Sequence, residues 1–257
     1  MKILGIIPAR YASTRFMGKP LVEIDGKTMI HRVYEQVKKA KSLSKIIVAT
    51  DDDRIFNHVK SFGGDVMMTS EKHQSGTDRC AEVVNNLMRH EILKKMMPNK
   101  PIKETLFDAV VNIQGDEPFI DPSQINKVVE ILNNSRFPIA TLVKKMENQE
   151  DILNPNIVKC VFSNNNKALY FSRSPIPYLR NIDDTDWHKT GEFYKHIGLY
   201  AYRTTVLNTI AQLLPSRLEK LESLEQLRWL ENGYEIGVAI TDIETIGIDT
   251  PEDLKKI

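Results

Sequence analysis

The chain of 257 residues has almost no net charge, only two cysteines and no long apolar run. Lysine and arginine number 35 against 34 acidic residues, which excludes the overall basicity of a nucleic-acid-binding protein. Cys80 and Cys160 lie in apolar segments without metal-ligand spacing, as is typical of a reducing cytosol. No segment approaches the roughly 18 apolar residues of a membrane span, and no charged-then-apolar leader opens the chain. We therefore expect a cytoplasmic protein that binds neither nucleic acid nor membrane.

The first half alternates short apolar runs with amphipathic stretches. We expect buried strands at 3–9, 45–50, 65–70 and 108–114, and helices at 28–41, 52–62, 76–92 and 121–134. Strands and helices in alternation predict an α/β fold, with a mostly parallel sheet covered by helices on both faces.

The second half departs from this rhythm. Strand-like runs at 158–163, 168–173 and 195–203 follow one another with turn signals, which predicts an antiparallel excursion over about 158–203. A helix at 216–232, a strand at 235–241 and a helix at 250–257 complete the chain. The Lys-rich stretch 93–107 is expected to be an exposed insertion. We expect one domain over residues 1–257.

The predicted helix at 216–232 begins with a capping box of Ser216 and Glu219. Its leucines at 218, 221, 224, 227 and 230 would face the core. The other faces point to solvent on this pattern alone, so Gln226 would be exposed and Glu225 would pair with Arg228 at i,i+3.

The segment "PARYASTRFMGKP" (residues 8–20) carries Arg10, Arg15 and Lys19, and no acid follows until Glu23. It leaves the first predicted strand at its carboxyl end, where open parallel sheets bind ligands. These cations and exposed backbone N–H groups would surround a polyphosphate. The segment lacks the P-loop pattern, and a solvated basic loop is the alternative.

Two further segments place carboxylates where a hard cation could bind. In "NIQGDEP" (112–118), Asp116 follows a strand and a tight Gly bend, a position suited to Mg²⁺, although an ordinary Gly-Asp turn explains it as well. In "GIDTPEDL" (247–254), Thr250 and Asp253 suit a helix start. Asp249 is not needed there, yet taken alone it is interpreted as structural.

The segment "HQSGTDR" (73–79) places Ser75 and Gly76 before a helix, where their polar groups could recognise a base or ribose. His73 by itself is interpreted as a hydrogen-bonded structural residue. The run "TDDD" (50–53) imitates the Asp-x-Asp of nucleotide-sugar glycosyltransferases, but capping of the helix at 52–62 explains it more simply.

Taken together, these segments resemble one family from end to end. The chain is similar to the 3-deoxy-manno-octulosonate cytidylyltransferases (CMP-KDO synthetases) in "IIPARYASTR", "HQSGTDR", "NIQGDEP", "ALYFSRSPIP", "HIGLYAYR", "LEQLRWLENG" and "GIDTPEDL". The resemblance implies a Rossmann-like nucleotidyltransferase fold with an antiparallel dimerisation excursion, and a homodimer. It implies transfer of the cytidylyl group of CTP to 3-deoxy-D-manno-octulosonate (KDO) for lipopolysaccharide synthesis. One departure is Phe16-Met17, where the family usually has Leu-Pro.

The resemblance also implies roles for individual residues. The catalytic residues would be Arg10, Lys19, Asp116 and Asp249, with Mg²⁺ held by the two aspartates. The nucleotide would be bound by Ala9, Arg10, Ser13, Arg15, Lys19, Gln74 and Ser75. The sugar acid would be bound by Gln114, Arg173, His196, Tyr200, Glu225 and Gln226. The cations of residues 8–20 would then be balanced by the triphosphate and not by protein.

Two alternatives stay open. Another acidic sugar, such as sialic acid or an 8-amino KDO analogue, needs only small changes of the pocket. A non-catalytic nucleotide-sensing module could keep the same fold, although it would have no use for both Asp116 and Asp249.

Overall fold

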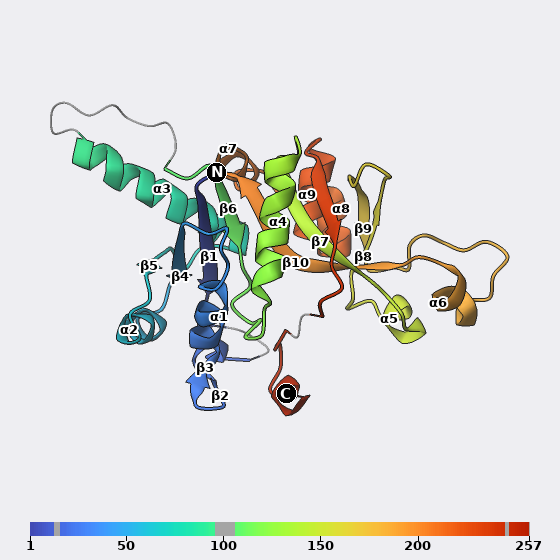
Figure 1. Cartoon of the computed structure of the whole chain (residues 1–257), viewed down its shortest axis with the longest axis horizontal. Helices are drawn as coiled ribbons and strands as arrows, with labels where there is room; N and C mark the ends of the chain where they lie inside the picture. Colours follow the sequence, from blue (N-terminus) through green and yellow to red (C-terminus); the bar gives the residue numbers. More distant parts are fainter. Residues whose placement is uncertain (13–15, 96–105, 245–246, 257) are drawn as a thin grey trace. The chain divides into compact units, whose positions relative to one another are not determined.

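The computed structural model describes residues 1–12, 16–95, 106–244 and 247–256 (Figure 1). The chain forms two compact units. Unit 1 comprises Met1–Asn126, Tyr202–Ala211 and Thr245–Ile257, and unit 2 comprises Lys127–Ala201 and Gln212–Glu244. Each unit is built from separate stretches of the chain, so no single linker separates the two units. The expectation of a single domain stays a prediction.

Unit 1 contains the elements predicted for the first half of the chain, with some short additions. Its strands are β1 (Ile3–Ala9), β2 (Glu23–Ile24), β3 (Lys27–Thr28), β4 (Lys45–Thr50), β5 (Val66–Met68) and β6 (Ala109–Asn112). Its helices are η1 (Lys19–Leu21), α1 (Met29–Val37), α2 (Asp53–Ser61), α3 (Gly76–Lys95), α7 (Thr204–Ile210) and η3 (Asp253–Lys256). Helix α4 (Pro122–Asn134) begins in unit 1 and continues into unit 2.

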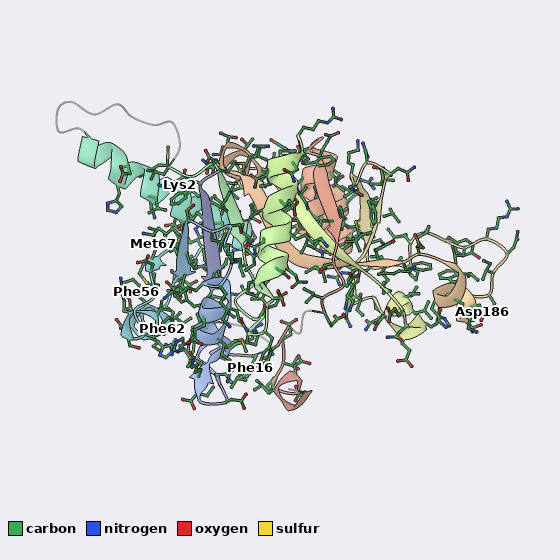
Figure 2. The ribbon with its side chains drawn as sticks, viewed as in Figure 1. Lys2, Phe16, Phe56, Phe62, Met67 and Asp186 are labelled. Carbon is green, nitrogen blue, oxygen red and sulfur yellow. The ribbon has the colours of Figure 1, made fainter. Side chains whose placement is uncertain are left out.

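The main strands of unit 1 form a parallel sheet in the order β6-β1-β4-β5. Residues of β1 and β6 are almost all buried, which explains why each strand is a continuous apolar run. Helix α1 buries Met29, Ile30 and Val33 on one face. Phe62, which follows α2, stacks on His31 of α1 with ring centroids 4.2 Å apart (Figure 2). The predicted α/β fold with a mostly parallel sheet is confirmed.

Unit 2 contains the antiparallel excursion. Its strands are β7 (Ile139–Lys145), β8 (Lys159–Phe162), β9 (Ala168–Ser172), β10 (Tyr194–Arg203, whose last two residues belong to unit 1) and β11 (Ile236–Ile240). Its helices are α5 (Gln149–Leu153), η2 (Asp184–Asp186), α6 (Trp187–Thr190), α8 (Arg217–Glu222) and α9 (Glu225–Glu231). Strand β8 pairs antiparallel with both β9 and β10, as predicted, whereas β7 and β11 are parallel.

The prediction of one continuous helix at 216–232 is wrong. The capping box of Ser216 and Glu219 is present, but α8 ends at Ser223, whose φ of 53° is left-handed. The Glu222 carboxylate accepts hydrogen bonds from the Ser172 hydroxyl (2.7 Å) and the Arg173 backbone N–H (3.0 Å), both at the end of β9. These tertiary bonds hold the chain where the leucine spacing alone would have continued the helix.

Two other expectations change in the structure, and a third concerns residues that are mostly not described. Leu221 is exposed (72%), because the break before α9 removes it from the apolar stripe. The predicted last helix is only the 3-10 turn η3. The predicted insertion at 93–107 lies mostly outside the described residues, and Phe107, at its end, is buried. None of the described helices is long and apolar enough to cross a membrane.

A buried lysine joins three stretches of unit 2. Lys159 is fully buried, and its Nζ donates hydrogen bonds to the backbone carbonyls of Asn154 (2.7 Å), Ile157 (2.8 Å) and Arg173 (3.0 Å). These carbonyls lie outside the strands, and that of Asn154 also accepts from the Ile157 backbone N–H (3.1 Å), so the ammonium adds hydrogen bonds where no strand pairs with the backbone. Burial lowers the pKa of Lys159. The residue therefore fixes the end of α5 to the end of β9.

We expect Lys159→Met to lower the free energy of unfolding by about 2 kcal/mol or more, because buried carbonyls would lose their donor. Lys189→Met is the matched control, since Lys189 is exposed and pairs with Asp186 on the surface; it should change stability by less than about 1 kcal/mol. Urea unfolding of both variants checks this. Equal losses in the two variants would contradict a structural role for Lys159.

Candidate active site

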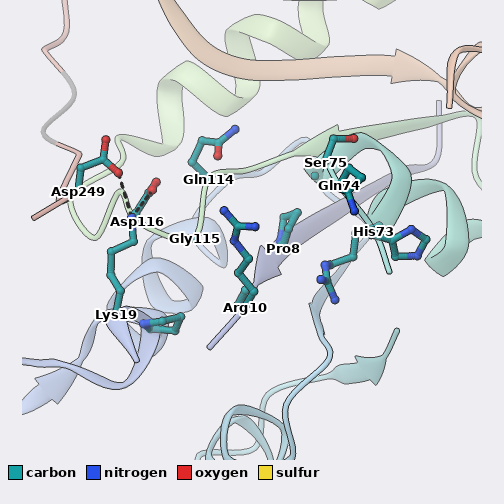
Figure 3. A pocket seen from close by; sticks show the side chains of 14 residues that line it. Pro8, Arg10, Lys19, His73, Gln74, Ser75, Gln114, Gly115, Asp116 and Asp249 are labelled. Atoms are coloured by element: carbon teal, nitrogen blue, oxygen red, sulfur yellow. Dashed lines mark hydrogen bonds and ion pairs between the residues drawn. The ribbon is translucent and has the colours of Figure 1, made fainter. Parts of the chain in front are cut away.

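A cavity of about 250 Å³ opens in unit 1 where β1 and β6 end (Figure 3). It is lined by Pro8, Ala9, Arg10, Lys19, Pro20, His73, Gln74, Ser75, Gly76, Arg79, Gln114, Gly115, Asp116 and Asp249. The residues that the sequence analysis assigned to the nucleotide and to Mg²⁺ therefore surround one space, together with Gln114. Ser13 and Arg15 lie outside the described residues, and the roles assigned to all of them stay predictions.

The turn after β6 is packed directly against the end of β1. A Cβ atom on Gly115 would lie 2.6 Å from the backbone oxygen of Pro8, a distance that only glycine avoids. The neighbours Gln114 and Asp116 are thereby held at the carboxyl edge of the sheet, beside the chain that leaves β1. This close approach is the physical reason for a glycine in "QGDEP".

A second glycine shapes the chain before Lys19. Gly18 has a left-handed φ of 71°, and its N–H donates to the carbonyl of Tyr11 (2.9 Å). The Tyr11 ring covers Gly18 so closely that an added Cβ would lie 3.0 Å from it, and the Arg54 guanidinium lies over the same ring at 3.2 Å. Lys19 therefore follows a glycine that is fixed by these contacts, and its side chain is 13% exposed.

Lys19 joins the two predicted metal ligands. Its Nζ lies 2.7 Å from Oδ2 of Asp116 and 3.1 Å from Oδ1 of Asp249 (Figure 3). The expectation that protein leaves this cation unbalanced is wrong for Lys19, because its partners lie 97 and 230 residues away in sequence. Arg10 reaches into the cavity between this cluster and the turn of Gln74 and Ser75 (Figure 3).

Two carboxylates converge here, and no group of three or more potential metal-ligating side chains occurs within the described ranges. Two carboxylates beside an open polar cavity fit Mg²⁺, which completes its shell with water and phosphate oxygens. The adjacent Glu117 faces the interior. Burial, and secondly the charge of Asp116, raise the pKa of the Glu117 carboxyl to about 8.

The opposite wall of the cavity begins helix α3. The Asp78 N–H donates to the Ser75 hydroxyl and the Ser75 N–H to the Asp78 carboxylate, both at 3.2 Å, so Ser75 caps the helix. The His73 ring contacts the Glu82 carboxylate, which also accepts from the Ser70 N–H (2.8 Å). His73 is thus hydrogen-bonded, as predicted, although it also lines the cavity.

Sequence reasoning missed Arg79. This residue is 4% exposed, and its guanidinium donates to the Thr69 hydroxyl (2.6 Å) and the Asp51 carboxylate (2.7 Å). Its position four residues after Ser75 on α3 could have indicated that it faces the same cavity.

Asp52 caps α2 through the Arg54 N–H (2.9 Å), so the capping interpretation of "TDDD" is confirmed for that residue.

The residues predicted to bind the sugar acid lie in unit 2, apart from Gln114. The Arg173 guanidinium donates to the carbonyls of Glu222 (2.7 Å) and Pro155 (3.0 Å). It therefore holds the junction of α8 and α9, immediately before Glu225. The convergence of these residues with Asp116 and Asp249 stays a prediction.

His196 and Tyr200 lie together on β10. Their ring centroids are 5.2 Å apart, and the His196 Nε2 is 3.0 Å from the Thr141 hydroxyl. The Tyr200 ring also meets Trp229 of α9 edge-on at 5.1 Å. Removal of the ring from water lowers the pKa of His196 to about 3.

The prediction of solvent exposure on α9 is wrong for Gln226 and Arg228, which are 6% and 9% exposed. Arg228 binds the Glu219 carboxylate, with Nε donating at 2.7 Å, and its Nη1 donates to the Leu213 carbonyl (3.0 Å). The turn at Ser223 folds α9 back along α8, and this brings Glu219 within reach of an arginine nine residues later.

A parallel α/β sheet with cations after β1 and a carboxylate after β6 defines the class of Rossmann-like nucleotidyltransferases. A family model described as cytidylyltransferase matches residues 4–243. The chain belongs to the cytidylyltransferase family.

Two curated relatives are 3-deoxy-manno-octulosonate cytidylyltransferases. The protein of Bacteroides thetaiotaomicron is 56% identical over 99% of this chain and 96% of its own. That of Parabacteroides distasonis is 55% identical over 100% of this chain and 96% of its own. The solved structure of a CMP:2-keto-3-deoxy-manno-octonic acid synthetase complexed with CTP matches with a TM-score of 0.86 at 38% identity, covering 100% of this chain and 96% of the other.

The low pKa of His196 predicts a loss of stability in mild acid. The unfolded chain takes up a proton near 6.5 and the folded chain only near 3, so the unfolded state binds more protons between these values. Between pH 6.5 and 5 the free energy of unfolding should fall by about 1.6 kcal/mol from this residue. Urea unfolding of the wild type and of His196→Gln at both pH values checks this. If the variant loses as much as the wild type, the cause is elsewhere.

Proposed function

We propose that the protein transfers the cytidylyl group of CTP to the anomeric hydroxyl of KDO, giving CMP-KDO and pyrophosphate. The observation that carries the proposal is the cavity at the ends of β1 and β6, where Lys19 and Arg10 face Asp116 and Asp249. The sequence similarity also supports the proposal, because the chain is 55% identical over its whole length to a 3-deoxy-manno-octulosonate cytidylyltransferase.

The reaction is one in-line displacement at phosphorus. The anomeric oxygen of the sugar acid forms a bond to the α-phosphorus of CTP, the bond from that phosphorus to the β-phosphate bridging oxygen breaks, and the hydroxyl proton leaves to solvent. Negative charge grows on the phosphate oxygens during this step. Arg10 and Lys19 supply fixed positive charge beside them.

We propose that Asp116 and Asp249 hold Mg²⁺. The metal when bound would lower the pKa of the attacking hydroxyl and neutralise phosphate charge. Support comes from the pairing of both carboxylates with one ammonium group. Lys19 can turn to the triphosphate only if another cation balances the aspartates, because two carboxylates this close repel each other.

The remaining assignments follow from the cavity wall and from the resemblance. Gln74 and Ser75, at the start of α3, would recognise the cytosine, and the backbone of Ala9 would contact the nucleotide. We propose that Arg173, His196, Tyr200, Glu225 and Gln226 bind the sugar acid. A homodimer, a cytoplasmic location and a role in lipopolysaccharide synthesis are proposed on the resemblance alone.

A turnover assay with CTP, Mg²⁺ and a panel of sugar acids, reading pyrophosphate release, tests the proposal. KDO should be the preferred acceptor, over sialic acid and an 8-amino KDO analogue. Preference for another acceptor would correct the substrate. Binding of CTP without turnover on any of them would favour a nucleotide-sensing module.

We expect Asp116→Asn to abolish nearly all turnover while the fold and most of the CTP affinity remain, because an amide binds Mg²⁺ poorly. Asp65→Asn is the matched control, since Asp65 is exposed and pairs only loosely with Lys45 (3.6 Å). Pyrophosphate release and CTP titration of both variants check this. Near-normal release from Asp116→Asn would remove the basis for the metal assignment.

We expect Lys19→Ala to slow the chemical step by roughly 10²-fold or more, if it behaves as other electrostatic donors do. Single-turnover kinetics measure this step apart from product release. Lys45→Ala, at an exposed lysine of the same unit, should leave the rate unchanged. A loss of stability with an unchanged rate would favour the solvated-loop interpretation of residues 8–20.

A further inference from the structure

We propose that Ile248 is a positioning residue, which sets Asp249 beside Asp116 through an apolar anchor. The inference rests on the proposed function, because it concerns a carboxylate of that site. It assigns a role to a side chain that does not line the cavity and that the sequence analysis did not single out.

Ile248 is fully buried although it lies in an irregular segment near the end of the chain. It forms a core cluster with Ile24 of β2 and Met29, the first residue of α1. Leu254 and Phe16 pack against the same cluster, and Phe16 lies beside the start of α1 (Figure 2). The segment at 247–254 is therefore attached to unit 1 by side chains on both sides of Asp249.

The backbone of the segment is fixed at the same place. The Ile248 N–H donates to the carbonyl of Asp116 (2.9 Å), so the residue before Asp249 is bonded to the residue that Asp249 must meet. The Asp249 and Thr250 N–H groups donate to the Asp253 carboxylate (3.1 and 2.9 Å). Asp249 thus projects from a backbone that is held on both sides.

The ion pair with Lys19 does not provide this attachment. The Asp249 side chain is 47% exposed, and an ion pair in contact with water contributes little and is screened by salt. Full burial of an isoleucine side chain is a larger and salt-independent contribution. Phe16, three residues before Lys19, packs against the same cluster, so the chain segments that carry both charged groups contact one apolar cluster.

The test compares Ile248→Ala with Leu207→Ala, a fully buried control in the same unit. Leu207 lies on α7. The first residue of this helix, Thr204, donates hydrogen bonds to the carbonyls of Phe107 and Asp108, which precede β6, whereas the cavity lies at the other end of that strand.

Both variants are measured for unfolding by urea, for kcat with KDO, and for Mn²⁺ binding with CTP by electron paramagnetic resonance. Ile248→Ala should lower kcat by up to about 10²-fold and weaken Mn²⁺ binding, as expected for a displaced group. Leu207→Ala should lower stability alone.

A double-mutant cycle with Asp249→Asn identifies the route of the effect. If Ile248 acts through Asp249, then Ile248→Ala should cost little further kcat in the Asp249→Asn background. Ile248→Val, which removes one methyl group, should show the same pattern at smaller scale and serves if the alanine variant does not fold. Additive losses, or equal effects on kcat in the Leu207 control, would overturn the proposal. A wild-type protein without turnover would overturn the proposed function instead, and Mn²⁺ binding would still decide for or against Ile248.

Discussion

The contact of one ammonium group with two carboxylates is the constraint on which the rest of the site depends. Asp116 follows β6, Asp249 lies near the end of the chain, and Lys19 bridges them at 2.7 and 3.1 Å. Each charged residue is positioned by its neighbour in the sequence. Gly18 precedes Lys19 with a left-handed φ, Gly115 precedes Asp116 and packs against Pro8, and the buried Ile248 precedes Asp249. The charged atoms supply the chemistry, and uncharged neighbours supply the geometry.

The free energies of the two kinds of interaction explain why apolar packing and backbone geometry position the charged residues. An ion pair in contact with water, such as that of Lys19 with the 47% exposed Asp249, contributes about 0–1 kcal/mol, whereas burying an isoleucine side chain contributes about 1.5–3 kcal/mol. If the aspartates exchange Lys19 for Mg²⁺, as proposed, those ion pairs cannot also be what holds the site together. Placement by packing leaves Lys19 and the aspartates free to change partners without loss of the local fold.

How far the sequence predicts this structure depends on the range of the interactions involved. The strands at 3–9 and 45–50 are predicted to the residue, because a buried parallel strand is a continuous apolar run. Asp116 could be placed at a strand end for the same reason. The balance of Lys19 by protein could not be predicted, because its partners are 97 and 230 residues away and local charge counting does not reach them. The break before α9 likewise depends on bonds from Glu222 to the end of β9, which no periodicity of leucines contains.

The motif residues of unit 2 show that a strong family pattern also records framework roles. Arg173, in "ALYFSRSPIP", donates to the carbonyls of Glu222 and Pro155, and Lys159 of the neighbouring strand likewise donates to backbone carbonyls. An arginine carries five N–H donors, so these bonds leave the guanidinium able to meet a ligand as well. Its Nη2 also lies 3.5 Å from the Ser223 carbonyl, so each nitrogen of the guanidinium has a backbone partner in unit 2. Resemblance alone does not separate a framework role from a binding role at Arg173, because a substitution there removes the bonds to Glu222 and Pro155 whether or not the residue also binds the sugar acid.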